Sequence, residues 1–133
     1  TADLVRAVME GVATNSAWLL KFVEKFAGKE LSPLRLLGGG AQSELWCQMY
    51  ADVLGRDVVQ VDQPLLAQMR GAALLASVAL KVRRLDEVGA KASGVIYRPS
   101  SSVADLYQAR VEQFPSLYAR DKNWSRKHAV TRK

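Results

Sequence analysis

The first 27 residues carry apolar side chains at a repeat of three and four positions. This repeat places them on one face of a helix, because an α-helix turns by about 100° per residue. Asp3 is the expected N-cap, and Gly28 is the expected end because glycine reaches φ > 0 at no steric cost. We expect this face to be buried. Its members are Leu4, Val5, Val8, Val12, Leu19, Phe22, Val23 and Phe26.

Shorter apolar segments then alternate with further helices. A strand is predicted at residues 34–37 and another at residues 58–61, the second rich in the β-branched side chains that strands favour. Between them, Ser43 is a natural N-cap for a helix that Gly55 closes. A third, alanine-rich helix is predicted over about residues 65–82 and a last helix over about residues 101–118.

Strands that alternate with helices indicate an α/β fold in which helices pack on a short parallel sheet. Ligands of such sheets favour the crevice outside the carboxyl ends of the strands. The run GGGAQS, residues 38–43, follows the first strand and therefore lies at such an end. Two strands are few for a self-sufficient sheet, so we also expect this chain to be marginally stable or to pair with another copy of itself.

The three consecutive glycines, Gly38, Gly39 and Gly40, have two possible explanations. Glycine permits a tight strand-to-helix turn, and its missing Cβ lets another group approach the main chain closely. The helix that follows presents unpaired N–H groups and the positive end of its dipole, which suit a phosphate or a hydroxyl group. No Lys-Ser/Thr pair follows the glycines, and the run does not fit G-x-G-x-x-G, so neither of these two phosphate loops is present.

Composition indicates a globular chain, with 49% hydrophobic and 24% charged residues. No apolar stretch approaches the roughly 20 residues that cross a bilayer, and no signal-peptide pattern opens the chain, so we expect a cytoplasmic location and no membrane partner. Cys47 is the single cysteine, without cysteine or histidine neighbours at metal-ligand spacing. We interpret it as a packing residue.

The net charge of +6 is concentrated at the C-terminus. Residues 120–133 contain six basic side chains and one acidic side chain, and residues 1–119 are nearly neutral. A basic segment with Trp124 in it offers an alternative function, in which the chain binds or assembles through this segment. The simpler interpretation is a solvated, poorly ordered terminus, and we do not expect nucleic-acid binding.

The run GGGAQSELWCQMYADVLGRDVVQV, followed by RGAALLASVAL, resembles the C-terminal domain of the FGGY carbohydrate kinases, with the xylulose kinase branch nearest. The opening RAVMEGVA helix and the closing Tyr97-Arg98-Pro99 segment fit the same family, so that the resemblance reaches about Arg120. It implies an actin-like ATPase (ribonuclease H-like) domain, of which residues 1–119 are the C-terminal portion and residues 120–133 a basic tail. FGGY kinases are several times longer, so we expect this chain to be a fragment.

The resemblance also implies residue roles in an ATP or ADP site. Gly39 and Gly40 match the glycine pair at the adenosine and the α-phosphate, and Gly38 and Ala41 shape the same turn. Ser43 matches a small polar residue near the purine or the ribose, although its capping role is an equal alternative. Gln42 is a candidate polar contact that could equally face solvent.

In this family, ATP phosphorylates a hydroxyl of a sugar such as D-xylulose. The reaction depends on Mg²⁺ as a cofactor and on an aspartate that acts as the base. The resemblance implies that this base, the sugar site and a second phosphate turn lie outside this chain. We therefore assign no catalytic or metal-binding residue, and we predict that the chain alone is inactive because phosphoryl transfer needs several groups positioned at once.

Several other polar or aromatic residues invite functional interpretations, but structural roles explain them more simply. Asp57 and Asp62 flank a strand as turn residues, and Asp52 suits a hydrogen-bonded position on a helix. Two tryptophans at helical spacing are expected in the core, a histidine is expected in the basic tail without an ordered partner, and an arginine is expected to face solvent. These four residues are Trp18, Trp46, His128 and Arg70.

Overall fold

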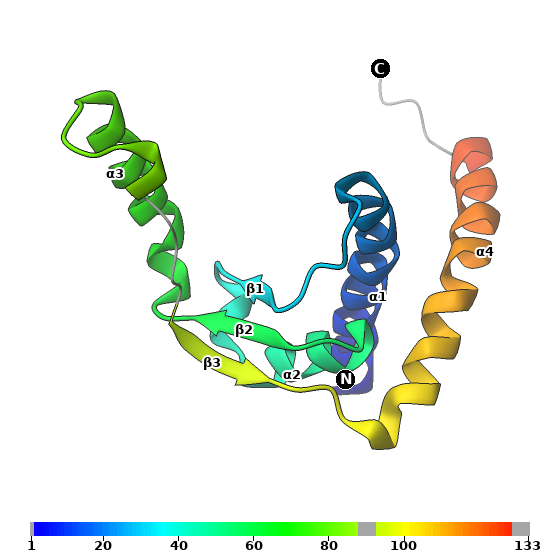
Figure 1. Cartoon of the computed structure of the whole chain (residues 1–133). Coiled ribbons are helices and arrows are strands. Elements are labelled where there is room, and N and C mark those ends of the chain that lie inside the picture. Colours follow the sequence, from blue (N-terminus) through cyan, green and yellow to red (C-terminus); the bar gives the residue numbers. More distant parts are fainter. Residues whose placement is uncertain (1, 88–92, 129–133) are drawn as a thin grey trace. The chain divides into compact units, whose positions relative to one another are not determined.

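The computed structural model describes residues 2–87 and 93–128 of the chain, with the backbone alone for residues 123 and 125–128 (Figure 1). The described chain divides into two compact units. The first contains Thr1–Leu31, Asp52–Gly55 and Pro99–Lys133, and the second contains Ser32–Ala51 and Arg56–Arg98. None of the helices in the described ranges is long and apolar enough to span a membrane.

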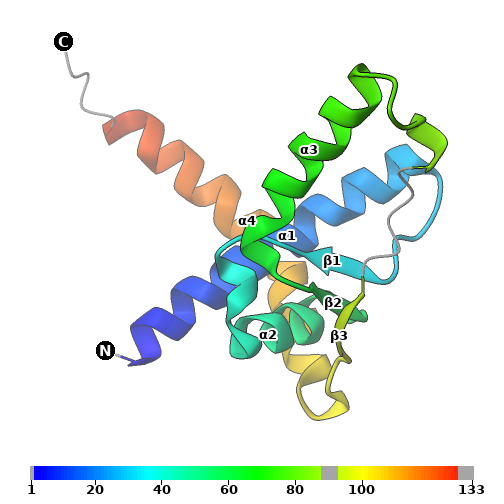
Figure 2. The same cartoon turned by 90° about the vertical axis from the view of Figure 1, so that its left-hand side faces the viewer.

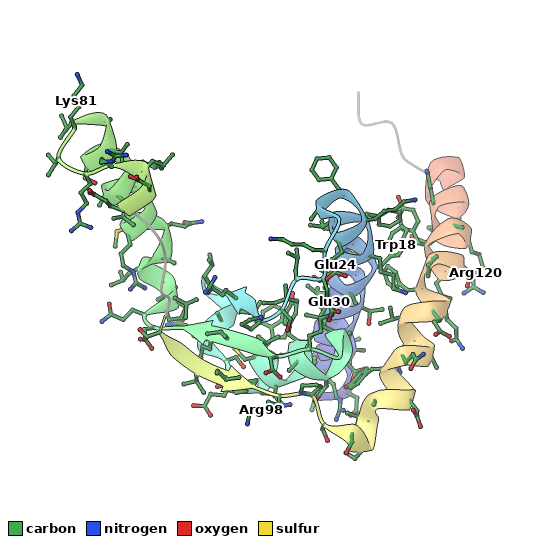
Figure 3. The ribbon with its side chains drawn as sticks, viewed as in Figure 1. Trp18, Glu24, Glu30, Lys81, Arg98 and Arg120 are labelled. Atoms are coloured by element: carbon green, nitrogen blue, oxygen red, sulfur yellow. The ribbon has the colours of Figure 1, made fainter. Side chains whose placement is uncertain are left out.

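Two long helices, α1 (Ala2–Ala27) and α4 (Ala104–His128), dominate the first unit and cross each other in the second view (Figure 2). α1 ends as predicted, at Gly28 with φ of +66°. Asp3 lies inside the first turn of α1 and not at its N-cap, which corrects that prediction, because the helix already begins at Ala2. The indole of Trp18 lies between the two helices, 5.8 Å from the ring of Phe114 and 5.1 Å from that of Tyr118 (Figure 3).

A polar cluster joins the same two helices around Glu10. Its carboxylate accepts hydrogen bonds from Arg6 on α1 and from the buried Tyr107 hydroxyl on α4, both at 2.9 Å, and it pairs with Arg110. Burial alone would raise the pKa of Glu10, but the hydrogen bonds from Arg6 and Tyr107 and the charges of Arg110 and Arg6 hold it below its usual value. The ionised carboxylate therefore stabilises the packing of α1 on α4.

Acid is expected to weaken this packing. A carboxyl whose pKa is lower in the folded state stabilises the protein above its unfolded pKa of about 4.3, and this stability is lost as the pH falls through the folded value. Glu10→Gln should therefore lower the free energy of unfolding at pH 7 by about 1 kcal/mol, because both arginines remain partly solvated. Urea titrations from pH 7 to pH 3 should show the two proteins converging. Glu112→Gln is the control, since among the described residues Glu112 accepts a hydrogen bond from Gln108 on its own helix, and an unchanged gap at pH 3 would contradict the prediction.

The apolar face predicted for α1 is present but is not buried. Exposed fractions of its eight side chains run from 42% for Val23 to 96% for Phe26. The buried residues of α1 are Ala13, Thr14 and Ala17, on the opposite side of the helix. The periodicity therefore predicted the helix correctly and its buried side wrongly, because α4 packs on the side of Glu10 and Trp18. We call these eight residues the α1 apolar stripe.

A three-stranded sheet forms the centre of the second unit (Figure 1). Strands β1 (Leu34–Leu36) and β2 (Val58–Val61) are parallel, as predicted, with Leu34 opposite Val58. β3 (Gly94–Tyr97) pairs with β2 in the antiparallel direction, with Val61 opposite Gly94. The sheet is thus mixed, and the prediction of a two-stranded parallel sheet missed β3, although its Val-Ile-Tyr run is typical of a strand.

Helix α2 (Glu44–Leu54) follows β1, and α3 (Ala67–Ala79) follows β2. α2 has the predicted ends, with Ser43 Oγ accepting the N–H of Trp46 at 3.3 Å and Gly55 at φ of +63°. Four of its residues are buried, including Cys47, which confirms the prediction that this cysteine packs. The last helix differs from prediction at the C-terminus, where α4 continues to His128 through residues expected to be poorly ordered. Residues 129–133 of the predicted tail lie outside the described residues.

Candidate nucleotide-binding turn

The glycine-rich turn lies where the parallel strands β1 and β2 both end. Residues 38–43 follow β1, and the segment 62–66 follows β2, so the two loops meet at one edge of the sheet (Figure 2). The N–H of Gly38 donates to the carbonyl of Pro64 at 2.9 Å and links them. This is the edge at which parallel sheets bind their ligands, as the sequence predicted.

Three glycines have three different environments in this turn. Gly38 adopts φ of +90°, a conformation that side chains strongly disfavour. At Gly40 a Cβ would lie 2.7 Å from the indole ring of Trp46, so that a side chain there would have to displace the ring. At Gly39 the backbone is helical, with φ of −62° and ψ of −41°, and a Cβ would meet no atom within 4 Å. Backbone conformation at position 38 and packing at position 40 thus favour glycine, and neither favours it at position 39.

A short 3₁₀ turn, Gly40–Gln42, connects the glycines to α2. Its first hydrogen bonds run from Gln42 to Gly39 and from Ser43 to Gly40, both at 3.2 Å. The N–H groups of Gly39, Gly40 and Ala41 precede these bonds, as expected at the start of a helical segment. Gly39 and Gly40 are exposed, so a ligand can reach this stretch of backbone.

The side chain of Gln60, on β2, holds the turn in place. Its Nε2 donates to the carbonyl of Ala41 at 2.6 Å, and its Oε1 accepts the hydroxyl of Tyr97 at 3.1 Å, so one side chain ties the turn to β2 and β3. Sequence analysis missed this positioning residue. The available signal was one polar residue inside the apolar run Val-Val-Gln-Val, because buried polar side chains are normally hydrogen-bonded.

The remaining predicted site residues divide between the floor of the turn and its surface. Ala41 is 4% exposed and belongs to the floor. Gln42 is exposed and available to a ligand. Ser43 is partly buried and caps α2, so its hydroxyl is already engaged with Trp46 N–H. The indole Nε1 of Trp46 is buried and has no hydrogen-bond partner among the described residues.

The other acidic and basic residues considered from sequence have structural roles. Asp52 accepts the N–H of Ser100 at 2.8 Å, and the carboxylate of Asp62 accepts the Ser93 hydroxyl. Arg70 donates to the carbonyls of Asp62 and Gln63 and thereby braces the left-handed turn at Gln63. Within the described ranges, no group of three or more acidic, histidine or cysteine side chains could hold a metal ion. The structure therefore assigns no residue to Mg²⁺.

Cys47 offers a chemical probe of the turn. Its side chain is fully buried, and its Sγ donates to the carbonyl of Ala41 at 3.7 Å. Burial, with a smaller contribution from Glu44, raises the pKa of this thiol, so that it stays protonated at neutral pH. We predict that a disulfide reagent reacts far more slowly with the native chain than with the chain in concentrated urea. Because the chain has one cysteine, absorbance of the released thiolate measures this directly, and equal native and unfolded rates would contradict burial of Cys47.

Comparison with known proteins identifies the family. The model of the "FGGY family of carbohydrate kinases, C-terminal domain" matches residues 1–80. The chain belongs to the FGGY family of carbohydrate kinases. The FGGY C-terminal domain has the actin-like ATPase fold, and the mixed α/β structure described above is consistent with it.

Relatives of this FGGY chain are named for different substrates. A glycerol kinase of Bordetella parapertussis is 36% identical over 126 residues, which are 94% of this chain and 25% of the relative. An autoinducer-2 kinase of Yersinia pestis is 34% identical over 122 residues, 88% of this chain and 22% of the relative. A xylulose kinase of Staphylococcus epidermidis is 28% identical over 124 residues, 91% of this chain and 25% of the relative.

Two consequences follow for this FGGY chain. The chain spans about a quarter of the length of the curated relatives that it matches. The resemblance to the family is confirmed, and xylulose kinases are among the relatives. The narrower expectation that the xylulose kinase branch is nearest stays a prediction. The glycerol kinase is 36% identical to this chain and the xylulose kinase is 28% identical.

Proposed function

We propose that this chain supplies the adenosine side of the ATP site in an FGGY carbohydrate kinase, through the turn at residues 38–43. In this proposal the backbone of Gly39 and Gly40 lies against the adenosine and the α-phosphate. Gly38 and Ala41 shape the turn, and Gln42 and Ser43 lie beside the ribose or the purine. FGGY kinases are phosphotransferases that use ATP, and family membership favours this function over a module that binds through its basic C-terminus.

Gly39 carries the proposal. Neither a positive φ nor a close neighbour requires glycine there, and the position is exposed at the ligand-binding edge of the sheet. Close approach of a ligand to the main chain would explain why this position is glycine. The start of α2 adds N–H groups and a helix dipole that favour negative charge. The residues present therefore fit an adenine nucleotide.

The chain's own residues bind and orient ATP in this proposal and leave the chemistry to the rest of the kinase. When bound, ATP supplies the phosphoryl group that passes to a hydroxyl of a small sugar or polyol. We assign no catalytic base to this chain, and Asp62, which follows β2, accepts a hydrogen bond from the Ser93 hydroxyl. D-Xylulose is one candidate acceptor, glycerol is another, and Mg²⁺ is expected only in the complete enzyme.

Nucleotide titration tests this proposal. The ¹⁵N-labelled chain is titrated with ADP and, separately, with adenosine while its amide resonances are followed. We expect shifts confined to residues 38–46, with the ADP shifts suppressed by salt more strongly than the adenosine shifts. No shift in this segment at saturating nucleotide would overturn the proposal for this chain. A coupled assay with ATP and D-xylulose should detect no product from the chain alone.

A further inference from the structure

The hydroxyl of Tyr97, the last residue of β3, takes part in the hydrogen-bond network of the glycine turn. It donates to Oε1 of Gln60 at 3.1 Å, and Nε2 of Gln60 donates to the carbonyl of Ala41 at 2.6 Å. All three residues belong to the second unit. Two side-chain hydrogen bonds in series therefore connect the antiparallel strand of the sheet to the turn that is proposed to hold the nucleotide.

The register of the sheet brings the two side chains together. Val58 lies opposite Tyr97. Gln60, two residues after Val58 on β2, lies opposite Val95. Directly opposed residues share a face of a sheet, and so do residues two apart along a strand, so Tyr97 and Gln60 are diagonal neighbours on one face. On its other side Gln60 lies opposite Leu36, the last residue of β1, so the network crosses the middle strand next to the point where the chain leaves for the turn.

The chemistry of the network fixes the orientation of the Gln60 amide. A carbonyl oxygen only accepts hydrogen bonds, so the group of Gln60 that faces Ala41 is its NH₂ group. The other end of the amide, Oε1, then needs a donor, which the hydroxyl of Tyr97 supplies. Burial, with smaller contributions from Glu44 and Cys47, raises the pKa of Tyr97, so this hydroxyl keeps its proton at neutral pH. Without the hydroxyl, the amide would lose the contact that holds its NH₂ group on Ala41.

The carbonyl of Ala41 is a point from which the whole turn can be displaced. Ala41 is the central residue of the 3₁₀ turn Gly40–Gln42, and its carbonyl also accepts the Cys47 thiol at 3.7 Å. Because a peptide unit is planar, the hydrogen bond from Gln60 fixes the plane of the peptide that follows Ala41. A rotation of this plane would move the adjoining backbone of Gly40, which is proposed to lie against the nucleotide, and small displacements in a binding site are costly.

We propose that Tyr97 is a positioning residue for nucleotide binding, which acts through Gln60 to hold the Ala41 carbonyl, and with it the glycine turn, in the geometry that receives an adenine nucleotide. This inference rests on the proposed function and adds β3 to the elements that determine the affinity of the site. The network joins a residue outside the matched segment 1–80 to the turn inside that segment.

A double-mutant cycle on the full chain tests this proposal. Dissociation constants for ADP are measured by calorimetry for the parent, Tyr97→Phe, Gln60→Met and the double variant, and a urea titration of each gives its stability. Tyr97→Phe should weaken ADP binding about fivefold, as expected for the loss of one hydrogen bond, and Gln60→Met should weaken it about tenfold. In the Gln60→Met background, Tyr97→Phe should have no further effect, because Tyr97 acts through Gln60. If Gln60→Met does not fold, the cycle is repeated with Gln60→Leu.

A matched control and a spectroscopic signature separate positioning from a merely structural contact. Tyr118→Phe makes the same chemical change on α4, at a side chain that is 47% exposed, and should leave ADP binding unchanged. In the ¹⁵N-labelled chain without nucleotide, Tyr97→Phe should shift the side-chain NH₂ resonances of Gln60 and the amide resonance of Gln42. A merely structural contact would lower the free energy of unfolding and leave the ADP affinity of the folded chain unchanged.

The remaining outcomes overturn this proposal in distinguishable ways. Equal ADP affinities of the parent and Tyr97→Phe, or unchanged Gln60 resonances in Tyr97→Phe, would overturn it and leave the proposed function standing. Additive losses of affinity in the double variant would also overturn it, because Tyr97 would then act by a route that does not pass through Gln60. A parent chain that binds no ADP would overturn the proposed function for this chain and this inference together.

Discussion

Replacing Gly94 with alanine is expected to separate β3 from the sheet. A Cβ at this position would overlap the backbone oxygen of Gln60 and lie 2.9 Å from its carbonyl carbon. Backbone atoms inside a strand pair cannot move aside as a flexible side chain can, so the cost should reach about 3 kcal/mol, at the upper end for overpacking. For a small domain this is a large part of the total stability.

Hydrogen exchange and urea unfolding measure this effect. Amides of β2 and β3 should lose protection in Gly94→Ala, while those of the α1–α4 unit keep theirs. Gly71→Ala is the matched control, because Gly71 lies inside α3 and a Cβ there would meet no atom within 4 Å. Alanine should stabilise that helix by about 0.5–1 kcal/mol. Unchanged protection of β3 in Gly94→Ala would show that the close approach to Gln60 is not a constraint in solution.

Alanine at Gly39 is expected to weaken ligand binding without a loss of stability, whereas alanine at Gly40 is expected to lower stability. Gly39→Ala should leave the free energy of unfolding within about 0.5 kcal/mol of the parent, because its backbone is helical and its surroundings are open. It should nevertheless weaken ADP binding about tenfold, which corresponds to 1.4 kcal/mol. Gly40→Ala should destabilise the chain by about 1–3 kcal/mol, because the new methyl group displaces the Trp46 ring.

Calorimetry with ADP and urea titrations of both variants separate these effects, and the reactivity of Cys47 reports on the turn itself. Gly40→Ala should increase that reactivity, because Cys47 bonds to Ala41 in the disturbed turn. Gly39→Ala should leave it unchanged. If Gly39→Ala bound ADP as tightly as the parent, this result would contradict the proposal that the nucleotide lies against Gly39, whatever the stability of Gly40→Ala.

Local sequence signals predicted much of the second unit. Ser43 and Gly55 set the two ends of α2 because a hydroxyl cap and a glycine at φ > 0 act within one helical turn. Strands β1 and β2 and their parallel pairing followed from short apolar runs separated by a helix. The position of the glycine turn at the ligand-binding edge followed from the same alternation. β3 was missed because a segment of four residues becomes a strand only through its partner.

The candidate site could be located from the sequence but not resolved into roles. The run of three glycines predicted a turn with an accessible backbone, and only the family resemblance set Gly38 apart from Gly39 and Gly40. The structure separates them, because the φ of Gly38, the Trp46 ring against Gly40 and the open surroundings of Gly39 depend on different atoms. Gln60, which holds the turn through Ala41, lies 19 positions away in the chain and carried only a weak signal.

The sequence by itself determined the order of the long helices, the glycine ends of α1 and α2, the parallel pair of strands and the family, because each depends on periodicity, capping or a contiguous motif. Only the tertiary structure decided which glycine of the turn neither φ nor packing requires and which side of α1 packs on α4. The polar side of α1, with Glu10 bonded to Tyr107, contacts α4, and the apolar stripe stays exposed. Periodicity identifies a face by its polarity, but burial depends on which partner reaches it, and that partner is set by contacts between distant residues.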